Sequence, residues 1–174
     1  MKNSVEDLIT KIRPVIATQS GIDINDIINS DSITGPELTK IVDGKKVPYQ
    51  TFDNFIVFEF TETPNVNIYE TYDDGKVHAI NSYALFLTVY GDKSRTISLR
   101  LKARMFTSEV QEYLSNIGIS ITRFGTIESS TETINTMVYI RRDMSIHFIN
   151  EMAFDLIDER ESILSAEIKN INTN

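Results

Sequence analysis

The side chains that could carry out chemistry are few in this sequence and lie far apart. The two histidines are His78 and His147, and neither has a second histidine at the HxH or HxxxH spacing of a metal-binding pair. We therefore interpret both as ordinary strand residues. Cysteine is absent, which excludes disulfides, thiolate metal sites and cysteine nucleophiles. The residues predict no metal site and no cofactor.

Serine and glycine patterns do not indicate an active site either. Ser82, Ser129 and Ser130 lack the glycine-flanked elbow that exposes the nucleophile of many serine hydrolases. The chain contains no GxGxxG, GxxxxGKS or GxxxxGKT motif, so the common phosphate-binding loops are absent. These patterns predict that the protein is not an enzyme.

Charged residues gather at three places that could be mistaken for sites. Asp73 and Asp74 form one predicted turn, and Glu159 and Glu161 belong to another. Acids at turns are normally solvated, and we assign these no catalytic role. The run Arg141–Asp143 has two interpretations, an internal ion-pair cluster, which we prefer, or an assembly contact.

Composition limits the classes of protein that remain. The 174 residues, 41% of them hydrophobic, suffice for one core, so we expect a single domain over residues 1–174. The net charge of −8 argues against tight, non-specific binding to nucleic acid. No apolar run is long enough to span a bilayer, and the start MKNSVEDLITK lacks the apolar segment of a secretory signal. We expect no membrane contact and folding in the cytosol.

The elements that must position any site are organised around residues 81–119. Tyr83–Tyr90 predicts a strand buried on both faces, and Gly91-Asp92 ends it, with Asp92 or Ser94 able to cap a following helix. The next segment, 93–105, is ambiguous. Alternation of apolar and polar residues favours a strand slightly, whereas Ile97, Leu101 and Met105 would form one face of a helix.

The rest of the chain predicts an α+β fold, with a mostly antiparallel sheet and helices packed on one face. A helix is expected from Ser4 to about Ala17, and a second from Thr107 or Ser108 to Gly118. Residues 19–50 predict a long loop or arm, which we expect to carry a partner contact. Strands are expected at 54–62, 66–72, 77–89, 119–124, 142–156 and 163–168, a surface loop at 125–136, and a frayed tail at 169–174.

The string YGDKSRTISLRLKARMFTSEVQEYLSNIGISITRFG resembles the middle of the bacteriophage tail-terminator, or neck terminator, proteins. In that family a strand ending in an aromatic-glycine corner leads to a helix, a short break, a helix of the EVxxYL type and a glycine-isoleucine strand. Val47-Pro48-Tyr49 with FIVFEFTE suits the family's entry into the sheet, and Tyr139–Phe148 suits its penultimate strand. The resemblance spans about Glu6 to Ile168 and implies that 93–105 is a helix.

The resemblance implies a structural virion protein, made in the bacterial host cytoplasm. Such proteins form a ring, typically of six copies, that ends the tail tube and joins it to neck, connector or head-completion proteins. DNA would pass through the bore without specific binding, and Asp73 and Asp74 are our candidates for facing it. Alternatives are another head-tail connector, head-completion or tail-tube component, and, from a different class, a small-ligand enzyme or sensor.

Lys93, Arg100 and Arg104 would form a basic stripe on the helix at 93–105. One interpretation is a solvated helix face; the other is a contact with an acidic edge of the neighbouring copy. Leu99 and Ala103 lie on a second apolar side of that helix and would need cover, which supports the subunit contact. The candidate interface residues are therefore Lys93, Leu99, Arg100 and Arg104.

Overall fold

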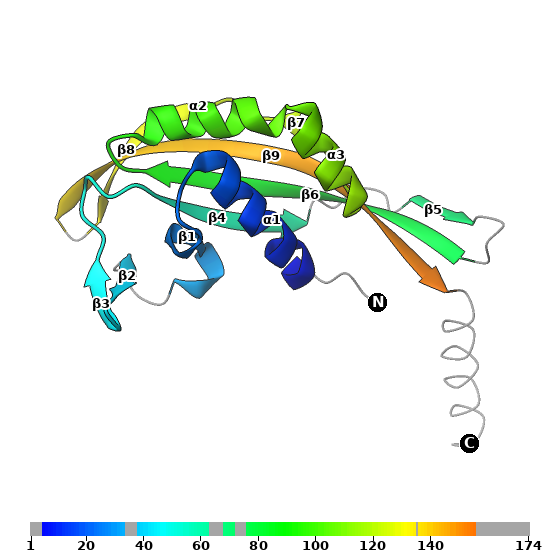
Figure 1. The fold of residues 1–174 in the computed structure, drawn as a ribbon, viewed down its shortest axis with the longest axis horizontal. Helices are drawn as coiled ribbons and strands as arrows, with labels where there is room; N and C mark the ends of the chain where they lie inside the picture. Colours follow the sequence, from blue (N-terminus) through cyan, green and yellow to red (C-terminus); the bar gives the residue numbers. More distant parts are fainter. Residues whose placement is uncertain (1–4, 34–37, 63–67, 72–75, 135, 156–174) are drawn as a thin grey trace, which may run out of the picture.

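Two long antiparallel strands, β6 (Lys76–Tyr90) and β9 (Met137–Asp155), form the centre of the sheet (Figure 1). The computed structural model describes residues 5–33, 38–62, 68–71, 76–134 and 136–155. The two long strands pair without interruption, from Lys76 opposite Asp155 to Tyr90 opposite Arg141. This ladder is the scaffold on which the other described elements are built.

Each long strand carries two shorter strands on its outer edge. On β6 these are β5 (Ile68–Thr71) and then β4 (Phe55–Glu62), and on β9 they are β7 (Ile119–Phe124) and β8 (Glu128–Ile134). The strand β1 (Ile27–Asn29) adds to β4 in parallel, whereas the other pairs are antiparallel. Seven strands of the described residues thus form one sheet, and the predicted strands at 54–62, 66–72, 77–89 and 119–124 are confirmed in place.

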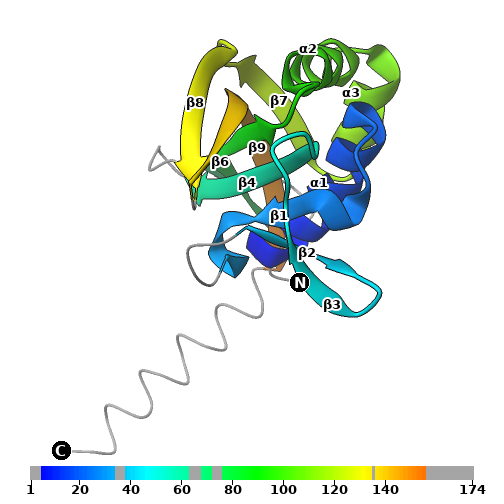
Figure 2. The same cartoon turned by 90° about the vertical axis from the view of Figure 1, so that its left-hand side faces the viewer.

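Helices α1 (Val5–Ser20), α2 (Ser94–Met105) and α3 (Ser108–Asn116) cover one face of this sheet (Figures 1 and 2). The predicted α+β class with helices on one face is confirmed. Alternate strand residues point at the helices, and burial of each such apolar side chain contributes about 1.5–3 kcal/mol. The core includes Leu8, Ile12, Ile16, Ile97, Leu101, Met105, Leu114, Leu85, Leu87, Ile146 and Phe148.

The ambiguous segment 93–105 is a helix, and the strand interpretation is wrong. Ile97, Leu101 and Met105 are buried at intervals of one helical turn, as a helix requires. A half-buried strand would instead have covered Leu99 and Ala103, but Leu99 is 53% exposed and Ala103 is exposed too. Burial against the sheet therefore selects the helical period.

The helix ends differ in part from the prediction. Neither Asp92 nor Ser94 caps α2, because the side chain of Asn54 accepts the hydrogen bond from the Lys93 backbone N–H at 2.9 Å. The predicted glycine terminator of α3 is confirmed, since Gly118 has a φ of 77°, which glycine adopts without strain.

The prediction of one long loop over residues 19–50 is wrong for its described part. After α1 the chain forms β1 between two short 3-10 turns, Ile24–Asp26 and Ser30–Ser32, and then a separate hairpin of β2 (Thr39–Val42) and β3 (Lys45–Pro48). The hairpin turn is Asp43-Gly44, with φ angles of 50° and 75°. An Asp-Gly pair between alternating residues is a strong hairpin signal, which the many polar residues of this segment had obscured.

The predicted surface loop at 125–136 is also wrong in its central part. Residues 128–134 form β8, which pairs with the first residues of β9, so that β9 begins at Met137 and not at 142. The sequence ESSTETI has little apolar content because β8 is an edge strand with no side chain fully buried. Backbone pairing with β9 makes this segment a strand.

A second, aromatic cluster lies on the sheet face opposite the helices. Phe55 stacks between Tyr49 and Tyr90, with ring centroids 4.0 and 4.6 Å apart, and Tyr139 meets Phe55 edge-on at 6.3 Å. The Tyr139 hydroxyl donates to the Tyr49 carbonyl oxygen at 2.7 Å. This cluster fixes the chain that leaves the β2–β3 hairpin to the sheet.

The predicted strand at 163–168 and the frayed tail lie outside the described residues.

Candidate functional site

The predicted basic stripe exists on α2, but part of it serves the fold. Arg100 and Arg104 are exposed on α2, and Lys93 is exposed at its N-cap position. The Nη1 of Arg100 donates to the carbonyl oxygen of Ser20 at 3.3 Å, which joins α2 to the C-terminal end of α1. Arg104 instead borders a groove between α1 and α3. The three basic residues therefore lie along one flank of the helix layer. Arg100, the middle one, is hydrogen-bonded to α1, whereas Lys93 and Arg104 lie exposed at the two ends.

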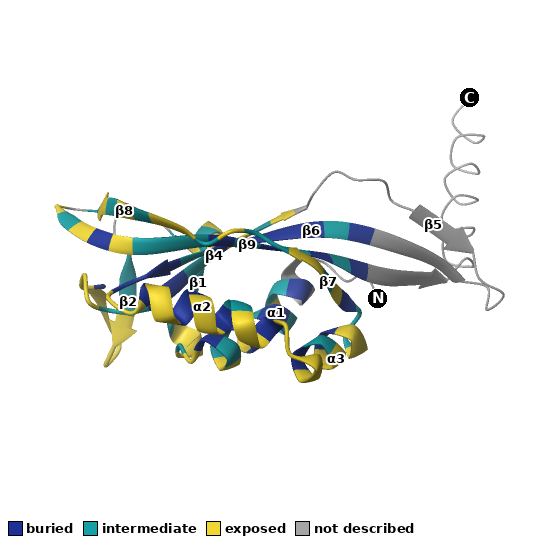
Figure 3. Ribbon diagram, turned by 90° about the horizontal axis from the view of Figure 1, so that it is seen from above, coloured by how far each residue is buried: buried dark blue, intermediate teal, exposed yellow. Residues whose placement is uncertain are grey.

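Exposed apolar side chains continue from α2 to α3. Leu99 is 53% exposed, Phe106 59% and Tyr113 52%. The ring of Phe106 packs against Phe124 of β7, with centroids 4.3 Å apart, and Tyr113 borders the groove between α1 and α3. Figure 3 shows this exposed surface along α2 and α3, opposite the buried residues that face the sheet. The exposed part of α2 and α3 thus carries three large apolar side chains, at separate positions.

The Arg141 cluster is internal, as our preferred interpretation expected. Arg141 donates to Glu132 at 2.7 Å and to Asp143 at 3.1 Å, and the hydroxyl of Tyr90 donates to the same Glu132 oxygen at 2.7 Å. Thr88 donates to the other oxygen of Asp143 at 2.9 Å. Burial raises the pKa of the Tyr90 hydroxyl, and its hydrogen bond to Glu132 raises that pKa further. The cluster ties β8 to β9 and β6.

A second ion pair fixes the base of the hairpin. The Nζ of Lys40 lies 2.7 Å from Oδ2 of Asp53, which also accepts the backbone N–H of Gln50 at 2.8 Å. Burial acts to raise the pKa of Asp53, but these two hydrogen bonds outweigh it and lower the pKa below its ordinary value. Tyr49 donates to Asp26 at 2.9 Å. These charged groups are engaged in holding the segment 38–53 in place.

The remaining predicted site residues form no reactive group in the described part of the chain. Asp73 and Asp74 lie outside the described residues. The ring of His147 has the Ser145 hydroxyl 3.4 Å from its Nε2, consistent with an ordinary strand residue. Within residues 5–155, leaving aside the gaps, no three histidine or acidic side chains come together as metal ligands. No helix there is long and apolar enough to cross a membrane.

The β2–β3 hairpin lies within the segment that the sequence predicted as an arm with a partner contact. Ile41 is 74% exposed, Val42 43% and Val47 36%, and Lys45 and Lys46 are exposed beside them. A groove of about 1020 Å³ separates the hairpin from α1 and β1, and a groove of about 680 Å³ lies between α1 and α3. The described surface therefore has two grooves and an exposed, partly apolar hairpin.

A family model for phage neck terminator proteins matches residues 8–174 of this chain. The chain belongs to the phage neck terminator family. The match covers nearly the whole sequence, and it confirms the resemblance drawn from residues 90–125. No curated protein shows significant similarity to the chain.

Membership of the neck terminator family decides the class of protein. This terminator is a structural phage protein and not an enzyme, and its place is the neck and tail region of the virion. Its partners are accordingly other neck and tail components.

Proposed function

We propose that this protein forms a closed ring of six copies at the end of the phage tail tube. The ring ends the tube and joins it to the neck or head-completion proteins, and DNA passes through its bore. The family match over residues 8–174 is the observation that carries the proposal. The protein is made in the cytoplasm of the bacterial host and acts by shape and symmetry, without turnover.

A closed ring requires two different surfaces on each copy, because each copy contacts one neighbour ahead and one behind. The exposed apolar residues of the terminator supply such surfaces at separate places. One is the solvent side of α2 and α3, and the other is the β2–β3 hairpin. This distribution supports head-to-tail assembly.

The outer surface of α2 is our candidate for part of the subunit interface. Leu99 supplies an uncovered apolar side chain, while Lys93, Arg100 and Arg104 supply positive charge along the neighbouring flank. An acidic protein with a net charge of −8 offers many acidic partners for that flank on a second copy.

Asp73 and Asp74 are our candidates for facing the bore. They lie between β5 and β6 in the sequence, and like charges would keep the phosphate backbone of DNA from adhering to the ring. The excess of acidic over basic residues in the whole chain supports an inner surface that does not bind DNA.

Light scattering after size exclusion, over a wide range of protein concentration, tests the ring. We expect a species with the mass of six copies, and electron microscopy of that species should show a bore wide enough for duplex DNA. Purified tail tubes provide the second arm, because some ring components assemble only on their template. A protein that stays monomeric and does not bind the ends of the tubes would refute the proposal.

A further inference from the structure

We propose that the β2–β3 hairpin of one copy docks in the groove between α1 and α3 of the next copy. This contact rests on the proposed ring and names the two surfaces that would build it. The occupant of the groove is a second copy of this chain, with Lys45 and Lys46 facing the acidic helix α3.

The hairpin has features of an element that a partner would stabilise. Among the residues that the structure describes, its two strands pair only with each other, apart from the seven-stranded sheet. A two-stranded hairpin alone is marginally stable in water. Bonds among the described residues hold its base, where Lys40 meets Asp53 and the Tyr49 N–H donates to the Leu38 carbonyl. Ile41 and Val42 in its outer half are exposed and border the groove toward α1 and β1, and Val47, opposite Lys40, is exposed nearer the base.

The receiving groove has a volume of about 680 Å³ and a mixed lining. Val15 and Pro14 of α1 form one side, and Val110 and Tyr113 of α3 form the other. Tyr113 is 52% exposed, so its ring is available to cover an incoming apolar side chain. The groove can therefore accept the apolar residues of the hairpin.

The exposed charges of β3 and of α3 are opposite, and on the groove lining Glu109 of α3 lies together with Arg104 of α2. The exposed acids of α3 are Glu109 and Glu112, one helical turn apart, and the helix contains no basic residue. Lys45 and Lys46 are exposed on β3. Within the described residues, none of these four side chains takes part in an ion pair. The hairpin cations and the α3 carboxylates are thus free to pair between copies.

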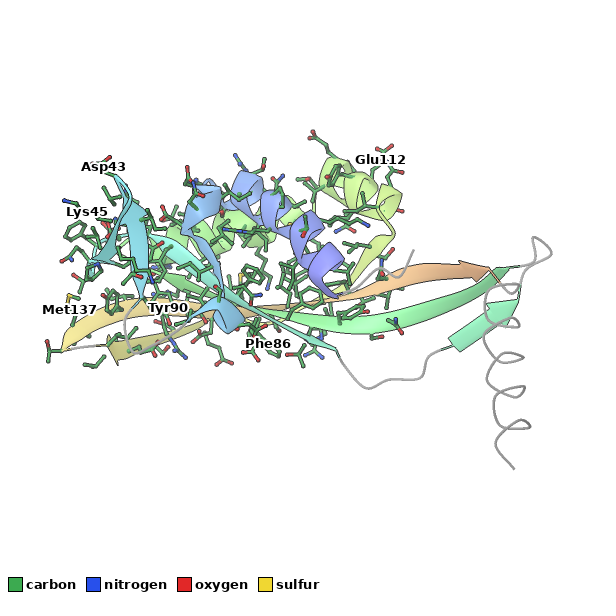
Figure 4. All side chains as sticks on the ribbon, turned by 90° about the horizontal axis from the view of Figure 1, so that it is seen from below. Asp43, Lys45, Phe86, Tyr90, Glu112 and Met137 are labelled. Atoms are coloured by element: carbon green, nitrogen blue, oxygen red, sulfur yellow. The ribbon has the colours of Figure 1, made fainter. Side chains whose placement is uncertain are left out.

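The placement of the two surfaces suits head-to-tail assembly. Figure 4 shows Asp43 and Lys45 at one end of the helix layer and Glu112 at its other end, on the same side of the sheet. The hairpin of one copy therefore cannot reach the groove between α1 and α3 of the same copy. Repetition of a contact between two different surfaces produces a ring when the rotation between copies closes.

Charge reversal tests the contact. We expect K45E/K46E and E109K/E112K each to raise the concentration needed for half-assembly by about tenfold or more. The combined variant K45E/K46E/E109K/E112K should return it toward the wild-type value. The matched control for K45E/K46E is S120E/R123E/S129E, which makes the same change in net charge at exposed residues of β7 and β8, outside the hairpin, the groove and α2. Assembly of K45E/K46E as readily as the control would overturn the proposal.

Cysteine cross-linking supplies an independent measurement, because the chain has no cysteine of its own. The V47C/Y113C variant, oxidised in solution and on tail tubes, should yield a ladder of linked copies up to the size of the ring. Each single variant should stop at dimers. Rings without a ladder would overturn the hairpin contact and leave the ring intact. Wild-type protein that remains monomeric in both settings would overturn the proposed function and this contact with it.

Discussion

Asn54 holds the first turn of α2 from a position 39 residues before Lys93. Its Oδ1 accepts the Lys93 backbone N–H at 2.9 Å, and its Nδ2 donates to Oδ1 of Asp92 at 2.9 Å. Gly91, just before Asp92, has a φ of 104°, and a Cβ at this position would collide with the Asp53 carbonyl oxygen. The corner between β6 and α2 is thus built by residues that precede β4.

Replacement of Asn54 should destabilise the protein through this corner. We expect N54A to lower the free energy of unfolding by about 1–2 kcal/mol, because the first free amide of α2 loses its acceptor. Urea unfolding followed by circular dichroism measures the change. The control is N116A, the same substitution at an exposed residue at the end of α3. Equal stability of N54A and wild type would contradict the capping role.

Substitutions at two leucines of α2 distinguish effects on folding from effects on assembly. Leu101 is fully buried and Leu99 is 53% exposed. We expect L101A to lower the free energy of unfolding by about 2–5 kcal/mol because it leaves a cavity in the core. L99A should change that free energy by less than about 0.5 kcal/mol but weaken ring formation. Urea unfolding and light scattering, measured on both variants, test these two expectations. Normal assembly of L99A would show that Leu99 is not part of the interface.

Alkaline pH should destabilise the terminator through its buried tyrosines. The pKa values of Tyr49 and Tyr90 are raised, first by burial and then by Asp26 and Glu132 respectively. Their contribution to stability is complete below their ordinary pKa of 10.0 and is lost as the pH rises above it, because the unfolded chain loses these protons first. Chemical unfolding at a series of alkaline pH values measures this decline.

The effect of Glu132 on Tyr90 can be measured directly. E132Q removes the carboxylate that raises the Tyr90 pKa, so tyrosinate absorbance should appear at a lower pH than in wild type. The Y90F variant identifies the signal, and E128Q on the same strand is the control. An unchanged Tyr90 titration in E132Q would show that burial alone sets its pKa.

Charge reversal at Asp73 and Asp74 tests whether they face the bore. We expect rings of D73K/D74K to bind duplex DNA with an affinity that falls steeply with salt, since lysines there would displace counterions from the phosphates. Wild-type rings should bind little DNA under the same conditions. A structure of the ring with these residues on its outer rim would contradict the assignment.

The sequence alone was sufficient to predict those helices and strands whose buried residues recur at the spacing typical of a helix or a strand. The helix α3 could be predicted because Val110 and Leu114 lie one turn apart and Gly118 ends it. The strand β4 could be predicted because Ile56, Phe58 and Phe60 alternate. A structural, non-enzymatic role could also be predicted, because the common catalytic and phosphate-binding motifs are absent, and the family match confirms it.

Other features depend on residues far away in the chain, and no local pattern contains them. The polar strand β8 forms because β9 offers it backbone partners, and the start of α2 is capped by Asn54. The period of 93–105 fits a strand or a helix, and the sheet decides by burying Ile97, Leu101 and Met105. The sequence by itself determined the α+β class and the structural role. Only the tertiary structure decided which surfaces remain exposed, because exposure depends on what the rest of the chain covers.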